Sequence, residues 1–294
     1  MPSDMKGVLR PSTYRFRMGG FEITTILDGV SQRDGPHPLF GSDQPAAVVQ
    51  DHAAANRLPR TRFEHSFTPA VVNTGNELVL FDTGNGPVRR DTGVGNLRAL
   101  LADAGYAPGD IDRVIITHGH PDHIGGLLED GEPAFPKADY MFGQREFDFW
   151  RRGENVPESR KANRELFVKL ALPLADQATL VADGDEVAPG IHAIEAFGHS
   201  AGHMAYHLES EGQRLLLWGD TANHYAVSLQ RPEWHAQADD DKEAAVATRK
   251  RILDMVATER LWVIGHHMPF PAVGTVEQSH DGYRWLPVSY QLNL

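Results

Sequence analysis

A dense group of metal-binding side chains lies in the segment His118-Gly-His-Pro-Asp-His. In an extended chain the side chains at i and i+2 point the same way, so His118 and His120 can present two imidazoles to one ion. Pro121 suits the start of a helix, whose first turn would hold Asp122 and His123 close to a second ion. The alternative is a polar surface loop, because a chain with 15 histidines clusters some by chance. The density of ligands favours a metal site.

Three more candidate ligands each follow a strand-like, apolar run. His199 comes after residues 191–197, Asp220 ends the run 215–219, and His266 ends the run 261–265. Sites built on β scaffolds commonly use residues at the points where buried strands emerge. We expect His267 to point away if that last strand continues, and we leave it outside the predicted metal set.

The elements that must position these residues come in two groups of strands, each followed by helices. Alternation and β-branched content predict strands, and helical spacing of apolar residues predicts helices. A charged run at 239–241 favours the start of a final helix that continues to about residue 259. The expected strands are 21–27, 69–73, 77–82, 113–117, 191–197, 203–208, 214–218 and 261–265, and the other expected helices are 94–104, 143–151 and 160–171.

Composition narrows the function classes. The formal net charge of −12 disfavours long-range attraction to nucleic acid or to an anionic membrane surface. Cysteine is absent, so thiolate ligands, disulfides and a thiol nucleophile are excluded, and the metal chemistry must use nitrogen and oxygen. The start of the chain has no apolar leader and no apolar run is long enough to span a bilayer, so we expect a cytoplasmic protein.

The pattern His118-x-His120-x-Asp122-His123, followed by His199, Asp220 and His266, resembles the metallo-β-lactamase-fold superfamily over most of the chain. The resemblance implies one α/β domain over residues 1–294, a four-layer αββα sandwich of two mixed sheets with helices outside. It also implies that one ion is held by His118, His120 and His199, the other by Asp122, His123 and His266, with Asp220 bridging the two.

The expected chemistry is hydrolysis by a dinuclear site. Two ions about 3.5–4 Å apart share a hydroxide nucleophile and polarise the scissile bond. Two divalent ions per chain are expected, with zinc favoured by imidazole and carboxylate ligands, although manganese, iron or cobalt fit the same set. We hypothesise that Asp122 orients the hydroxide and carries its proton to the leaving group. Asp220 would act with it as the bridging carboxylate.

Two further residues are expected to support the site. Asp82, in Phe-Asp-Thr-Gly, resembles a superfamily position that orients a metal-bound imidazole by hydrogen bonding. The alternative is a turn aspartate bonded to its own backbone. His203 is expected to be a structural histidine beside the site and not a ligand.

Substrate choice is expected to depend on residues 32–68 and 221–240, because specificity in such folds lies in loops. Segment 32–68 has no clear period and suggests a lid or a dimerisation excursion. Pocket ligands are mostly surrounded by apolar side chains. The candidates for the pocket wall are Phe40, Phe63, Phe67, His224, Tyr225, Trp234, Met268 and Phe270. The alternative for each is ordinary packing in the core or in a loop.

Residues 265–274 and 282–287 are similar to the branch that contains methyl parathion hydrolase and related lactonases. This similarity implies a lactonase or arylesterase with possible phosphotriesterase activity, a small-molecule ester or lactone substrate, and a homodimer. Acyl-homoserine lactonases commonly carry a tyrosine three residues after the bridging aspartate, where this chain has Asn223. Quorum-signal cleavage therefore stays an alternative.

Other functions on the same ligand set are weighed below the lactonase hypothesis. A glyoxalase II-type thioesterase lacks a recognisable basic cluster in the C-terminal region for its substrate. A nuclease does not suit the acidic charge. A di-iron redox protein would need a flavin partner domain that is not recognisable here, and a purely binding role would leave no turnover on esters.

Overall fold

The computed structural model describes residues 3–289 and 292–294. Strands form two seven-stranded mixed sheets and two short hairpins. The first sheet is built, in spatial order, from β1 (Thr13–Met18), β2 (Phe21–Ile26), β5 (Ala70–Asn73), β6 (Leu78–Phe81), β7 (Arg113–Ile116), β10 (Asp139–Gly143) and β11 (Ala178–Val181). The second contains β12 (Glu186–Ala188), β13 (Ile191–Glu195), β14 (Met204–Ser210), β15 (Gln213–Leu217), β16 (Trp262–Ile264), β17 (Val273–Ser279) and β18 (Gly282–Pro287).

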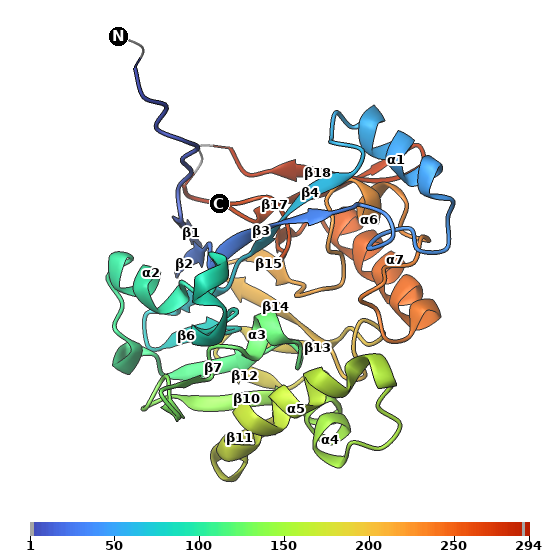
Figure 1. Ribbon diagram of the computed structural model, residues 1–294. Coiled ribbons are helices and arrows are strands. Elements are labelled where there is room, and N and C mark those ends of the chain that lie inside the picture. The colour runs from blue at the N-terminus through green and yellow to red at the C-terminus, as the bar shows by residue number, and fades with distance from the viewer. Residues whose placement is uncertain (1–2, 290–291) are drawn as a thin grey trace.

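The two sheets pack face to face, and helices cover their outer faces (Figure 1). Apolar side chains of both sheets, such as Ile115 and Tyr206, form one buried cluster between them. The outer face of the first sheet is covered by α2 (Leu97–Asp103), α4 (Gln144–Arg152) and α5 (Lys161–Leu170). The outer face of the second is covered by α6 (Val227–Gln230) and α7 (Lys242–Thr258). The expected four-layer αββα sandwich is confirmed.

Segment 32–68 forms a hairpin beside the second sheet, with a helix in its connection. β3 (Gly29–Asp34) pairs antiparallel with β4 (Arg62–Phe67), and α1 (Ala46–Ala55) lies between them in sequence. Figure 1 shows α1 close to α6, and the β3–β4 hairpin near the edge of the second sheet. The segment is thus more regular than its sequence suggests, while a lid or dimerisation role stays a prediction.

Two strands beyond the expected last strand extend the second sheet. β17 pairs with β16 and β18 pairs with β17, both antiparallel. The sequence interpretation ended the strands at residue 265 and was wrong there. A small hairpin of β8 (Leu128–Glu129) and β9 (Glu132–Pro133) follows the one-turn helix α3 (Pro121–Ile124). Among the described residues, no helix combines the length and apolar character needed to cross a membrane.

Strand direction explains how the two sheets bring distant residues together. β6 and β7 run parallel, as do β15 and β16. Because β14 is antiparallel to both β13 and β15, those two strands also run in the same direction. The carboxyl ends of neighbouring parallel strands lie at the same sheet edge. The loops after β6 and β7 therefore emerge together, as do those after β13, β15 and β16.

Candidate metal centre

The turn after β7 forms as its residue types require. His120 is extended at the N-terminus of α3 and Pro121 occupies the first helical position, where a missing N–H costs nothing. Gly125 and Gly126 lie against the loop after β6, where a Cβ on Gly125 would overlap the carbonyl oxygen of Asn85. Two glycines therefore let α3 approach the Asp82 loop closely enough for their side chains to meet.

Three histidines form the first ligand group. Ligand atoms of His118, His120 and His199 all lie within 4.8 Å of one another. The Nε2 of His199 is 3.0 Å from the Nδ1 of His120, and both residues are buried. This is the trio that the resemblance implied for one ion.

Asp220 lies between this group and a second one. Its Oδ2 is 3.2 Å from His199 Nε2 and 3.0 Å from His267 Nε2, and its Oδ1 is 3.2 Å from His123 Nε2. One carboxylate thus contacts imidazoles on both sides, which is the position of a bridging ligand. The second group consists of Asp122, His123, His266 and His267.

His267 belongs to the cluster, and the expectation that it points away was wrong. β16 ends at Ile264, so strand alternation no longer applies three residues later. Its Nδ1–H donates to the carbonyl oxygen of Ser66 at 2.8 Å, which leaves Nε2 free to face Asp220 and Asp122, the latter at 3.4 Å. The second histidine of the pair therefore has the more direct contacts with both carboxylates.

His266 lies on the inner side of the same group. Its ring is 4.0 Å from that of His123, its Nδ1 is 3.9 Å from Asp82 Oδ2, and its Nε2 is buried without a hydrogen-bond partner among the described residues. His266 and His267 both lie close enough to the second group to be candidate metal ligands. The predicted ligand role of His266 stays a prediction, and His267 joins it.

Hydrogen bonds fix the ring orientation of several cluster histidines. The Nδ1–H of His123 donates to Asp82 Oδ2 at 2.8 Å, and that of His199 donates to Asp239 Oδ1 at 2.8 Å. Such partners set the tautomer that leaves Nε2 free as a ligand. Asp82 is not a turn aspartate bonded only to its own loop, since it also accepts from the backbone N–H of Thr117.

His203 supports the cluster from behind, as expected. Its Nδ1–H donates to the carbonyl oxygen of Ala196 at 3.1 Å, and its Nε2 accepts the backbone N–H of Asp220 at 2.9 Å. Burial, together with the neighbouring His199, lowers the pKa of His203 to about 3, so the ring is a neutral acceptor. This bond anchors the loop that carries Asp220.

Sequence reasoning missed two buried acids that hold the loops. Glu146 accepts hydrogen bonds from Gly119 N–H, Trp150 Nε1–H, Ser200 Oγ–H and Gly202 N–H at 2.7–2.8 Å. It thereby joins the loop of the first two histidines to that of His199. Asp239 pairs with the buried Arg249 at 2.7 Å as well as with His199. Neither acid lies near the ligand motif in sequence, and no local pattern marks them.

Burial and neighbouring charges shift the pKa values of the cluster residues in different directions. Burial lowers the pKa of His118 and His120 well below the ordinary value, and neighbouring histidines lower it further. Burial also acts to lower the pKa of His199, but the carboxylates of Asp220 and Asp239 outweigh it and raise that pKa to about 9. Although burial opposes it, His267 and other imidazoles hold the pKa of Asp220 well below its usual range.

The donor set passes a test of fit to metal. Buried atoms normally find hydrogen-bond partners. Among the described residues several site atoms have none, namely the Nε2 atoms of His118, His120, His123 and His266 and the Oδ1 of Asp220. Nitrogen and oxygen donors left unpartnered in a dry cluster suit divalent ions such as zinc.

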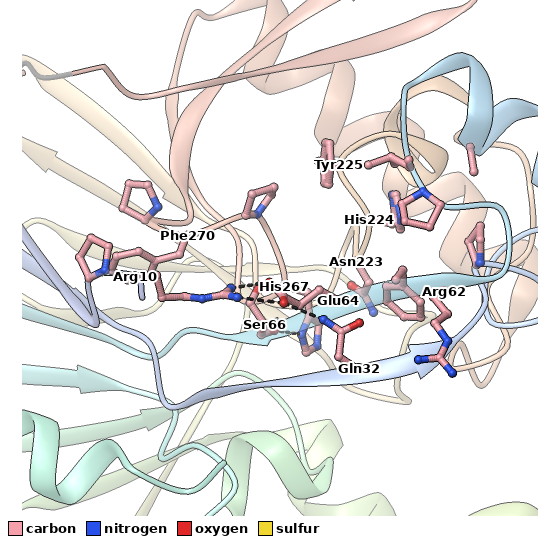
Figure 2. A pocket seen from close by; sticks show the side chains of 18 of the residues that line it. Arg10, Gln32, Arg62, Glu64, Ser66, Asn223, His224, Tyr225, His267 and Phe270 are labelled. Carbon is pink, nitrogen blue, oxygen red and sulfur yellow. Dashed lines mark hydrogen bonds and ion pairs between the residues drawn. The ribbon is translucent and has the colours of Figure 1, made fainter. Parts of the chain in front are cut away.

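A largely apolar cavity of about 610 Å³ opens onto the centre (Figure 2). Its wall includes His267 and Asn223 at the cluster end, and Phe63, Tyr225 and Phe270 further out. Figure 2 shows Arg10 and Gln32 both bonded to Glu64 in the wall of the cavity. We name this the apolar cavity.

A second cavity, of about 460 Å³, lies on the other side of Phe63 and Asn223, which line both. We name it the basic cavity, because Arg33, Arg160 and Lys242 line it. Phe40 forms part of its wall.

The expected pocket residues divide between these cavities and the core. Phe63, His224, Tyr225 and Phe270 line the apolar cavity and Phe40 the basic one. The interpretation of the other three as pocket walls is corrected, since neither cavity is lined by Phe67, Trp234 or Met268. Phe67 and Met268 are almost fully buried, and Trp234 packs in a cluster with Phe40 and Val49. Apolar type alone does not separate a pocket wall from a core position.

The model of the metallo-β-lactamase superfamily matches residues 68–267, well over half of the chain. The chain belongs to this superfamily. The matched region spans the Asp82 loop and every residue of the cluster described above. The finer resemblance to methyl parathion hydrolase stays a prediction.

Known relatives include lactonases. An N-acyl homoserine lactonase of Bacillus cereus is 27% identical over 169 residues, which are 57% of this chain and 60% of that protein. One from Bacillus thuringiensis is 26% identical over 162 residues. The chain therefore matches less than two thirds of the length of these relatives.

Solved structures extend the likeness to nearly the whole chain. AidC, described as a dizinc quorum-quenching lactonase in complex with a product, superposes with a TM-score of 0.88 at 23% identity, covering 95% of this chain and 98% of AidC. AbOPH, described as a hydrolase in the β-lactamase superfamily, superposes with a TM-score of 0.86 at 26% identity, covering 97% of this chain and all of that one. The likeness to AidC shows the fold.

Proposed function

We propose that this protein is a hydrolase that holds two divalent metal ions, zinc by preference, and cleaves lactones or esters. The observation that carries the proposal is the convergence of imidazole nitrogens and carboxylates in two groups on either side of Asp220. His118, His120 and His199 would hold one ion, and Asp122 and His123 the other, with Asp220 between them. His267, which contacts both carboxylates, would complete the second set in place of the predicted His266. When bound, the ions would activate water and polarise a carbonyl group.

Asp122 is the residue best placed to move a proton. Its side chain is 17% exposed, against 4% for Asp220 and none for His123. It is therefore the more exposed of the two acids in the cluster, and the one that a leaving group can approach more easily. A carboxylate that keeps one oxygen outside the ligand set can accept a proton and deliver it to a leaving oxygen.

Asn223 orders the substrate end of the centre. Its Nδ2–H donates to Asp220 Oδ2 at 3.2 Å, and its Oδ1 is buried without a partner among the described residues. Figure 2 shows Asn223 near His267 at the inner end of the apolar cavity. The amide thus holds the bridging carboxylate while its free oxygen can accept an N–H from a substrate.

The apolar cavity supports substrates with a hydrophobic arm. Phe63, Tyr225 and Phe270 provide aromatic wall around the path to His267. Hydrophobic lining with few polar groups is typical of pockets for small molecules. N-acyl homoserine lactones are the first substrates to test, because that activity is named for the relatives.

Steady-state kinetics on matched lactone, aryl ester and phosphotriester substrates test the proposal. The protein should be reconstituted in turn with zinc, manganese and cobalt. We expect lactone or ester turnover that requires metal and is lost in Asp220→Asn. Full metal loading without hydrolysis of any of the three substrate classes would contradict the proposed function. A lactone kcat/KM far below both other classes would overturn the lactonase preference.

A further inference from the structure

The basic cavity holds more positive charge than its own acids neutralise. Arg160 pairs with Asp240 at 2.6 Å. Asp239 is committed to Arg249 and His199. Arg33 and Lys242 have no ion-pair partner within 4 Å among the described residues. Two unpaired cations in one cavity stand out in a protein whose net charge is −12.

The polar contacts of these two cations leave capacity for a ligand. The Nε–H of Arg33 donates to Ser31 Oγ at 3.2 Å. Lys242 Nζ donates to the backbone carbonyl oxygens of Gln237 and Asp239 and to no other acceptor in residues 3–289 and 292–294. Burial lowers the pKa of Lys242, which reflects the cost of a charge held partly away from water. An anion placed beside the ammonium would offset that cost.

His65 provides an independent sign of a ligand in the same cavity. Both of its ring nitrogens are shielded from solvent and have no hydrogen-bond partner among the described residues. The ring stacks on His267, with centroids 4.0 Å apart and planes at 30°. A buried polar group without a partner is costly unless a bound group satisfies it. His65 is therefore a donor without a partner in the wall of the basic cavity, next to the metal centre.

The position of the cavity relates such an acceptor to the reaction. His65 stacks on His267, Asp239 bonds to His199, and Asn223 bonds to Asp220, and all three line the basic cavity. Phe63 and Asn223 separate this cavity from the apolar one. A substrate whose scissile group lies at Asn223 can extend one arm into each cavity.

We propose that the basic cavity is a subsite for a carboxylate carried by the substrate, held by Arg33, Lys242 and the N–H of His65. This inference rests on the proposed function and narrows its substrates to lactones or esters with an apolar arm and an anionic arm. A guanidinium presents paired donors that match the two oxygens of a carboxylate. Leu39, Phe40 and Phe63 line the same cavity. Apolar neighbours exclude water and so would strengthen the ion pair between the substrate carboxylate and Arg33.

Kinetics on two esters of equal chain length test the subsite. The substrates are 4-nitrophenyl hexanoate and the 4-nitrophenyl monoester of adipate, which differ only in a terminal carboxylate. The zinc-loaded protein should give a higher kcat/KM on the adipate ester. Arg33→Gln should lower that preference about tenfold or more, the range of a charge-assisted hydrogen bond, and leave hexanoate ester turnover unchanged. Lys242→Gln should also lower the preference for the adipate ester.

Arg62→Gln is the matched control, since it removes one positive charge from an exposed side chain at the start of β4 that lines the apolar cavity. It should leave the preference unchanged. Calorimetric binding of adipate and of hexanoate, without turnover, provides a second readout, and adipate should bind more tightly to the wild type but not to Arg33→Gln.

The outcomes separate this inference from the proposed function. Hydrolysis of both esters at similar kcat/KM, with no effect of Arg33→Gln, would overturn the subsite and keep the hydrolase. Equal loss of preference in Arg62→Gln would also overturn it, because the effect would then be one of net charge. Absence of all hydrolysis, with adipate still bound through Arg33, would contradict the proposed function and support the anion site.

Discussion

Replacing Asp82 by asparagine should weaken metal binding without disturbing the fold of its loop. Asp82 has a positive φ of 61°, a conformation that asparagine tolerates better than most residues. Its Oδ1 accepts from Thr117 N–H at 2.8 Å and its Oδ2 from His123 Nδ1–H at 2.8 Å. The amide of an asparagine can keep the first bond but places an N–H₂ against the second donor.

The expected loss of metal affinity follows from this mismatch between two N–H donors. To accept from the new amide, His123 must move its proton to Nε2, the atom that faces Asp220 at 3.2 Å. A protonated Nε2 cannot bind a metal ion. Loss of such an orienting partner typically lowers metal affinity 10–100-fold, or about 1.4–2.7 kcal/mol. We expect this loss mainly for the ion held by Asp122 and His123.

Competition with a chromophoric chelator measures the effect for each of the two ions. Asp112→Asn is the matched control, because Asp112 also accepts a backbone N–H, that of Leu78, but does so at the opposite end of β6 from Asp82. It should bind metal as the wild type does. If Asp82→Asn bound both ions with unchanged affinity, the assignment of Asp82 as the partner that orients His123 would be refuted.

Three further changes test other parts of the structure. His267→Ala should lower the metal content of the purified protein from two ions to one, whereas His266→Ala should retain more of the second ion; elemental analysis showing the reverse would return the ligand role to His266. Glu146→Ala should lower the free energy of unfolding by about 3 kcal/mol or more, because four buried donors lose their acceptor; a denaturant titration showing a loss below about 1 kcal/mol would contradict this. Burial, with the charge of His52, lowers the pKa of His224 to about 4, so the folded state binds fewer protons than the unfolded state between pH 4 and about 6.5. Stability should therefore fall by up to about 3 kcal/mol as the pH drops through that window, and His224→Gln should remove this part of the fall; parallel pH curves of unfolding would count against it.

The sequence predicts which side chains gather in the cluster because most of them follow recognisable strands. β7, β13, β15 and β16 are short and apolar, and each is followed by a candidate ligand. The resemblance to the superfamily then predicts that these candidate ligands, although far apart in sequence, meet at one site. His267 was missed because its predicted orientation assumed that β16 continues beyond Ile264, where the strand ends.

The parts that were not predicted depend on long-range packing. Glu146 lies on α4 and bonds to Gly119 and Gly202, which are 27 and 56 residues away in sequence, so nothing near it marks the role. β17 and β18 carry polar residues on exposed faces, which weakened the alternation expected of a strand. The basic cavity draws Arg33, Arg160 and Lys242 from three distant segments, and only the folded chain places them together.

The metal-to-protein ratio of zinc-loaded protein, after dialysis against metal-free buffer, tests the central claim most directly. Elemental analysis alongside quantitative amino-acid analysis gives this ratio without reference to any substrate. Two tightly held ions per chain in the wild type are the predicted result, with a clear deficit in Asp220→Asn. A wild-type protein that retains no ion, or an unchanged ratio when Asp220 is replaced, would contradict a centre built around that carboxylate.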